Sequence, residues 1–83
     1  LAFQRSGEIA GAINQYAEAI KLDPTHVGAL NNLGVIMSGL GRFDQAEILF
    51  SEALKHRPDD DRARKNLDFA LTKQGEMAEI VNQ

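Results

Sequence analysis

The sequence predicts an all-α fold built of antiparallel helix–turn–helix units stacked side by side. Three features of the 83-residue chain lead to this fold class. Apolar residues recur at helical spacing on two faces between residues 29 and 58, and a glycine separates these faces. The same pattern returns 34 residues away in both directions. Repetition at such an interval is typical of solenoids, in which each unit buries its apolar face on its neighbours.

The central unit, residues 26–59, is predicted to be a complete repeat with helices at 26–40 and 43–56. The apolar face of the first helix consists of Leu30, Leu33, Met37 and Leu40. That of the second consists of Phe43, Ala46, Phe50, Ala53 and Leu54. Gly34 lies on the first face, where a missing side chain lets two helices approach closely. Gly41 is predicted to make the turn, and Pro58 to end the second helix.

The first unit, residues 1–25, is predicted to be a partial repeat. Residues 1–6 are assigned to the end of an earlier helix, followed by a turn at Gly7 and a helix at 8–22. The buried stripe of that helix consists of Ile9, Ala12, Ile13, Tyr16, Ala19 and Ile20. Residues 23–25 are predicted to form a turn in which Asp23 or Thr25 caps the next helix. Because the first residue is Leu1 and not Met, we expect a piece of a longer protein.

The last unit, residues 60–83, is predicted to be a partial or capping repeat with a helix at 61–74, after which Gly75 aligns with Gly41. Leu67, Ala70 and Leu71 are assigned to its buried face. Asp68 stands at the position equivalent to Gly34, which suggests that no regular repeat packs there. Three consecutive aspartates, at 59–61, invite a metal site, but aspartate is also a preferred helix cap and favours the positive end of a helix dipole. We predict the cap.

The order of these residues resembles the tetratricopeptide repeat family. The motif consists of Leu33, Gly34, Met37, Gly41, Phe43, Ala46, Phe50, Ala53 and Pro58. At the 34-residue interval Gly7 aligns with Gly41 and Gly75, Pro24 with Pro58, and Asn32 with Asn66. The resemblance covers about two and a half repeats. It implies a segment of a right-handed superhelical solenoid.

Catalytic, cofactor and metal chemistry are not predicted. The chain has no cysteine, which excludes disulfides and thiolate sites. His26 and His56 are far apart in sequence, and no glycine-rich phosphate motif follows a strand. No apolar run reaches the length of about 18 residues that a membrane span needs, and no signal peptide is visible. We therefore predict a non-enzymatic, cytoplasmic protein that does not insert into membranes.

The first helix of each unit keeps a second face that packing does not explain, and we call its side chains the inner row. The inner row consists of Arg5, Asn31, Asn32, Val35, Ser38, Arg62, Lys65, Asn66, Phe69 and Lys73. The resemblance implies that this row lines a concave groove for an extended peptide or a partner helix. Amides that both donate and accept suit a peptide backbone, although exposed asparagines can also serve only solubility.

Charge points to an acidic partner. The net charge of −3 argues against nucleic acid, yet the inner row carries only positive formal charges. The resemblance also suggests a clamp for a C-terminal carboxylate, because Asn32 and Arg62 match two of its positions. Asn66 stands where the clamp has arginine, so a clamp is not predicted.

Self-assembly is the alternative function. Repeats bury their faces only on neighbours, and about three are usually needed for stability. Phe3, Ile9 and Ile13 are expected to leave apolar surface open at the N-terminal end, where a second copy can stack. Molecular mass measured against concentration distinguishes this alternative from peptide binding by a monomer.

Overall fold

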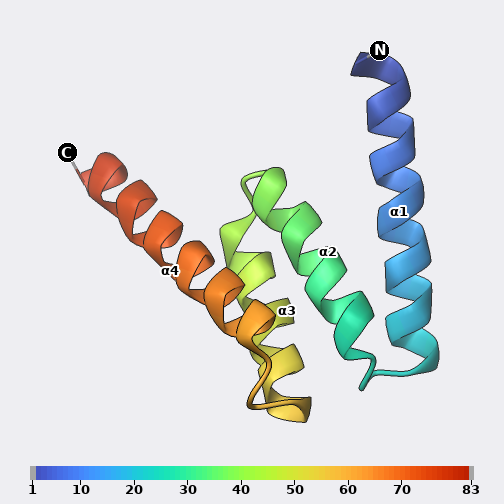
Figure 1. Cartoon of the computed structure of the whole chain (residues 1–83). Helices are drawn as coiled ribbons and strands as arrows, with labels where there is room; N and C mark the ends of the chain where they lie inside the picture. Colours follow the sequence, from blue (N-terminus) through green and yellow to red (C-terminus); the bar gives the residue numbers. More distant parts are fainter. Residues whose placement is uncertain (1, 83) are drawn as a thin grey trace.

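Four helices make up the structure, a computed structural model that describes the backbone of residues 2–82 and the side chains of residues 7–79. They are α1 (Ala2–Leu22), α2 (Val27–Gly39), α3 (Phe43–His56) and α4 (Asp61–Asn82), and the described range contains no strand. α2 packs on α1 and α3, α3 packs on α4, and α2 also touches α4. Figure 1 shows α1 and α4 on opposite sides of the α2–α3 pair. The all-α helical-repeat prediction is confirmed.

The centre of the core lies between α2 and α3, which run in opposite directions (Figure 1). Ala46, Phe50 and Ala53 of α3 are completely buried. A Cβ added to Gly34 of α2 would lie 2.7 Å from Cζ of Phe50, closer than carbon atoms approach. The aromatic ring therefore fills the space that the glycine leaves, as the close-contact prediction requires. Leu33 and Met37 complete this cluster.

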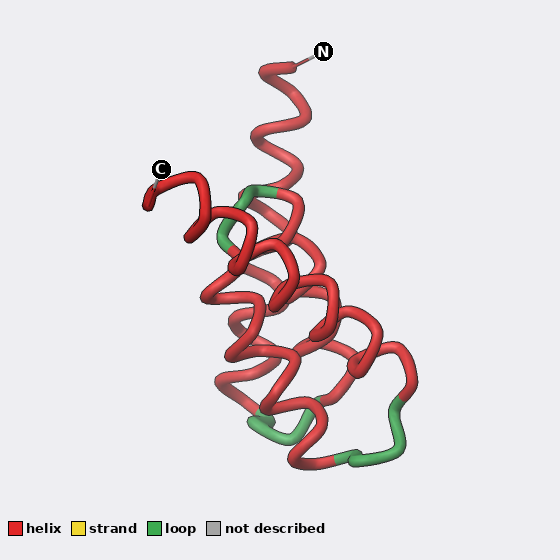
Figure 2. The backbone as a smooth tube through the Cα atoms, turned by 90° about the vertical axis from the view of Figure 1, so that its left-hand side faces the viewer, coloured by secondary structure: helices red, strands yellow, loops and turns green. Residues whose placement is uncertain are grey.

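The outer helices attach to the core from both sides (Figure 1), and short loops join successive helices at the two ends of the stack (Figure 2). Ala63 and Ala70 of α4 are fully buried. From α1, Ile13, Tyr16 and Ile20 pack partly buried against the central cluster. The buried stripe of α1 is confirmed at these three positions, and the expectation that Ile13 lies open is wrong. The expected exposure of Phe3 concerns a side chain outside the described residues.

The turn between α2 and α3 occurs at Gly41, as predicted, with φ at 80°. Its N–H donates to the Ser38 carbonyl at 3.0 Å, and the Arg42 N–H donates to the Met37 carbonyl at 2.8 Å. These two bonds satisfy carbonyls at the end of α2 in a Schellman motif, which needs a left-handed residue at this position. Glycine adopts that conformation without the steric cost that a Cβ brings.

An aspartate caps α4, as predicted. Oδ1 of Asp60 accepts hydrogen bonds from the backbone N–H groups of Arg62 at 3.0 Å and Ala63 at 3.2 Å. The first N–H groups of a helix have no partner within the helix, so a carboxylate at this point stabilises its start. The described residues contain no group of three or more acidic, histidine or cysteine side chains that could hold a metal ion.

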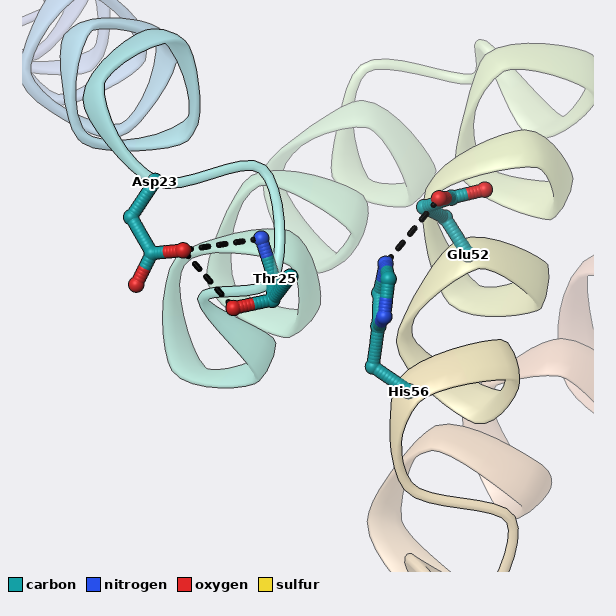
Figure 3. Close-up of polar contacts among 4 residues, drawn as sticks. All are labelled: Asp23, Thr25, Glu52 and His56. Atoms are coloured by element: carbon teal, nitrogen blue, oxygen red, sulfur yellow. Dashed lines mark hydrogen bonds and ion pairs between the residues drawn. The ribbon is translucent and has the colours of Figure 1, made fainter.

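The cap of α2 differs from the prediction. His26, and neither Asp23 nor Thr25, is the N-cap, with Nδ1 accepting a hydrogen bond of 3.0 Å from the Ala29 N–H. Figure 3 shows why Asp23 does not cap the helix. Its carboxylate closes the turn, accepting from the Thr25 N–H at 3.0 Å and the Thr25 hydroxyl at 2.7 Å. Only the residue directly before Val27 is placed to reach the unpaired N–H groups.

The turn predicted at Gly7 does not exist, and the helix predicted to end at residue 74 does not end there. Gly7 lies inside α1 and Gly75 inside α4, which extends beyond the predicted end at residue 74. A Cβ added at either glycine would meet nothing within 4 Å. The turn at Gly41 lets α3 fold back on α2 and bury Phe50. At Gly7 and Gly75, the described residues before and after the glycine belong to one helix and do not fold back on each other. Without that burial, unbroken helical hydrogen bonds outweigh the cost of about 1 kcal/mol of a glycine in a helix.

Two residues assigned to buried faces are instead half exposed. Leu40 is 44 % exposed and Leu71 is 45 % exposed. Leu40 follows the last residue of α2 and has left helical geometry, so it no longer continues the apolar stripe. Leu71 lies on a side of α4 that none of the described helices covers. Periodicity identifies an apolar face but not whether a neighbouring helix is present to cover it.

Candidate functional site

A pocket of about 390 Å³ lies between α2 and α4. Its lining consists of Val35, Ser38, Gly39, Phe50, Asn66 and Phe69, and we call it the inner pocket. Four of these residues belong to the predicted inner row. They meet because α2 and α4 contact each other and run in the same direction (Figure 1). Helical spacing therefore places residues at equivalent positions of the two repeats opposite each other where the helices meet.

A hydrogen bond joins the two helices beside the inner pocket. The Arg62 guanidinium, from the first turn of α4, donates to Oδ1 of Asn32 at 2.7 Å. Both side chains belong to the predicted inner row, and the structure brings them together from positions 30 residues apart. Since Oδ1 already accepts from Arg62, the pair presents mainly N–H donors to a ligand.

Asn31 does not belong to the inner row. It is 2 % exposed, and its amide donates to Oδ2 of Asp60 at 3.2 Å. The same aspartate caps α4 through its other oxygen. Asn31 therefore holds the start of α4 against α2 and is not accessible to a ligand. Its own Oδ1 is buried and has no hydrogen-bond partner in the described part of the chain.

Phe69 stands at the edge of the inner pocket and is 50 % exposed. Its ring packs edge-on against Phe43 of α3, with centroids 6.1 Å apart. Nζ of Lys73 lies 5.6 Å from the centroid of the Phe69 ring, within the range of cation–π attraction. Lys73 also forms an ion pair with Glu76 at 3.2 Å. These contacts hold the aromatic side chain and one basic group in place at the rim.

The other basic side chains of the inner row are less constrained. Lys65 is exposed, and neither it nor Arg62 forms an ion pair within the described residues. Their charge is therefore available to a ligand, whereas that of Lys73 is partly neutralised by Glu76. The role predicted for Arg5 concerns a side chain outside the described residues.

Sequence reasoning missed the part played by α3. Phe50 was assigned only to the core, yet its fully buried ring also forms the floor of the inner pocket. The glycine at position 34, which makes room for that ring, was the available signal.

A second hollow of about 350 Å³ is lined by Gly41, Phe43, Asp44, Gln74 and Met77. There Gln74 donates to the Phe43 carbonyl at 3.0 Å and to Oε1 of Glu47 at 2.6 Å.

The histidines and the first turn serve local structure. Figure 3 shows His56 beside Glu52, with 3.1 Å between Nε2 and Oε1, one helical turn apart on α3. The Thr25 hydroxyl, followed by its backbone N–H, donates to Asp23 and lowers the pKa of that carboxyl below its ordinary value. Both contacts lie on exposed surface and join residues close in sequence, so they stabilise a turn and a helix end.

Successive antiparallel helices, packed around a glycine of α2 that faces an aromatic ring of α3, define a helical-repeat protein. The family model described as tetratricopeptide repeat matches residues 4–68. The chain belongs to this family, whose repeats are protein-interaction modules.

Three relatives illustrate this membership. Photosystem I assembly protein Ycf3 of Synechococcus sp. (strain CC9902) is 34% identical over 86 residues, covering the whole chain and 50% of that protein. Ycf3 of Synechococcus sp. (strain WH7803) is 29% identical over 82 residues, 95% of the chain and 47% of that protein. The probable UDP-N-acetylglucosamine–peptide N-acetylglucosaminyltransferase SPINDLY of Petunia hybrida is 36% identical over 72 residues, 87% of the chain and 8% of that protein. The chain thus spans about half the length of these Ycf3 relatives.

The helices do not have the character of membrane spans. Within the described residues, none of them combines the length and the apolar composition that crossing a bilayer demands.

Proposed function

We propose that this chain is a non-enzymatic interaction module whose inner row binds an extended, acidic segment of a partner protein. The observation that carries the proposal is the 2.7 Å hydrogen bond between Arg62 and Asn32. It fixes a guanidinium and an amide side by side, and the other N–H groups of the two side chains can donate to a ligand. A carboxylate is the acceptor that such donors bind most strongly, because charge-assisted hydrogen bonds are shorter and stronger than neutral ones.

The remaining inner row suits the rest of such a ligand. Lys65 adds a positive charge that forms no ion pair with any side chain the structure describes, and the Asn66 amide can both donate to and accept from a peptide backbone. The chain as a whole has a net charge of −3, so its overall charge repels an acidic partner. Attraction therefore comes from the inner row at short range, and binding is expected to be sensitive to salt.

The relatives indicate the kind of process. The name of Ycf3 describes assembly of a protein complex, and we propose that this chain also helps to bring protein partners together. SPINDLY is named as a transferase, but the region that matches this chain forms only 8% of that protein. The proposed function assigns no catalytic step to any residue of this chain, and a cytoplasmic location stays a prediction from the sequence.

Salt dependence of binding tests the proposal. Affinity for a capped, glutamate-rich peptide is measured at low and high salt for the parent, Lys65→Ala, Asn66→Ala and the control Lys55→Ala, which changes an exposed lysine of α3. Lys65→Ala should weaken binding mainly at low salt, since ions screen charges beyond about 8–10 Å. Asn66→Ala should cost about 0.5–1.5 kcal/mol at both salt concentrations. Equal effects of Lys65→Ala and Lys55→Ala would contradict the assignment to the inner row.

Self-association is a second candidate, favoured by apolar surface on α4. Leu71 and Met77 are 45 % and 49 % exposed, and Met77 also lines the second hollow. A second copy that covers these side chains would remove apolar area from water. Sedimentation over a wide concentration range tests this: Leu71→Ser with Met77→Ser should lower the apparent mass if the surface is an interface. A parent that stays monomeric throughout would rule it out.

A further inference from the structure

The exposed apolar side chains of the inner pocket, unlike most others on the surface, lie together around one hollow. Val35 and Phe69 are 44 % and 50 % exposed and line one hollow from two helices. Leu22 and Ile48 are more exposed still, but neither lines the inner pocket or the second hollow. Oγ of Ser38, also in the lining, is buried and without a hydrogen-bond partner in the described part of the chain. An apolar hollow with a few polar groups at its margin is the usual form of a ligand site.

We infer that the inner pocket receives one apolar side chain of the bound segment, two positions along from an acidic residue held by Asn32 and Arg62. This inference rests on the proposed binding to the inner row. The volume of about 390 Å³ lies near the lower limit of ligand pockets. It has room for one aliphatic or aromatic side chain, and a partner helix would need a longer apolar trough.

The spacing follows from the geometry of the two helices. The pocket residues of α2 lie about five positions beyond Asn32, and those of α4 about five beyond Arg62. At a rise of about 1.5 Å per residue, the pocket centre lies roughly 7–8 Å from the Asn32–Arg62 pair. In an extended peptide, residues i and i+2 are about 6.6 Å apart and point to the same side. An acidic and an apolar side chain at this spacing can reach both places together.

Charge selects the same ligand. The pair at one end of the pocket offers N–H donors, and the exposed Lys65 of α4 adds positive charge. A neutral apolar peptide would leave these groups unused, while a purely acidic one would leave the pocket unfilled. The recognised segment is therefore acidic and apolar together, in an extended conformation.

Three capped peptides test the inference. The first is Glu-Ser-Leu-Ser-Glu, whose symmetry allows either chain direction. The second replaces leucine by serine, and the third, Ser-Glu-Leu-Glu-Ser, keeps the composition but changes the spacing. Affinities are measured by calorimetry for the parent, for Val35→Ser and for Leu71→Ser, which alters an equally exposed α4 side chain outside the pocket. Helicity measured by circular dichroism confirms that each variant is folded.

The first peptide should bind the parent about tenfold more tightly than the second, since burying a leucine side chain is worth at least that factor. Val35→Ser should reduce this ratio severalfold, and Leu71→Ser should leave it unchanged. Equal binding of the first two peptides would overturn the inference while the proposed acidic ligand stands. Equal binding of the first and third would overturn the spacing. If none of the three binds, the proposed function itself fails.

Discussion

Neighbouring asparagines of α2 take opposite roles. Asn31 is buried and holds Asp60, the cap of α4, while Asn32 lies on the inner row and accepts a hydrogen bond from Arg62. Successive residues of a helix point about 100° apart, so one step along the chain separates a structural side chain from one that is accessible. Together the two amides fix the start of α4, and thereby place Arg62 beside the inner pocket.

At the residue scale, the close contact at Gly34 can be tested directly. Gly34→Ala should destabilise the fold by about 1–3 kcal/mol, because the new methyl group would overlap the Phe50 ring. Gly11→Ala is the matched control, since a Cβ there meets nothing within 4 Å and α1 should gain about 0.5–1 kcal/mol. Urea unfolding measures both variants. A Gly34→Ala protein as stable as the parent would contradict the packing described for α2 and α3.

Much of the candidate site could be predicted from the spacing of residues in the sequence. The prediction that Asn31 is accessible to a ligand was wrong, and the reason is physical. Helical spacing placed Val35, Asn66 and Phe69 on one face, and these three do line the inner pocket. Spacing within α2 did not separate Asn31 from Asn32, since both lie near the boundary of the apolar face. The buried Asn31 donates to Asp60, which is 29 residues away, and that pairing depends on where α4 begins.

At the scale of elements, the aligned glycines 7, 41 and 75 behave differently. The 34-residue interval is a property of the sequence, but a turn forms only where the following helix buries a face against the preceding one. α3 does so after Gly41, through Phe50 and its neighbours. At the other two positions the helix continues. Periodicity was therefore enough to predict which segments form helices, but it did not predict where α1 begins or where α4 ends.

Alanine at two of these glycines should have opposite effects. Gly41→Ala should cost about 1–2 kcal/mol, because a side chain at positive φ clashes with the backbone. Gly75→Ala should stabilise α4 by about 0.5–1 kcal/mol, because glycine loses more freedom in a helix than alanine does. Thermal unfolding with circular dichroism reports both changes. If both variants shift stability in the same direction, the assignment of one turn and one continuous helix is wrong.

At the scale of the whole molecule, the inner row differs in charge from the chain as a whole. The chain is acidic overall, yet the inner row between α2 and α4 carries Arg62, Lys65 and Lys73. The exposed side chains of α3 include the apolar Ile48 and the acidic Glu52, and neither belongs to the inner row. The basic and amide groups of the inner row predict that the contacts of an acidic ligand concentrate on α2 and α4.

Mapping a bound peptide onto the backbone tests this claim most directly. The protein is labelled with ¹⁵N, and the capped Glu-Ser-Leu-Ser-Glu peptide is titrated into it while amide chemical shifts are recorded. The largest changes should occur at Asn32, Val35, Asn66 and Phe69, including the side-chain amides of the two asparagines. Amides of the outer positions 18, 48 and 52 should hardly move. Changes centred on those outer positions, with the inner row unaffected, would contradict the central claim.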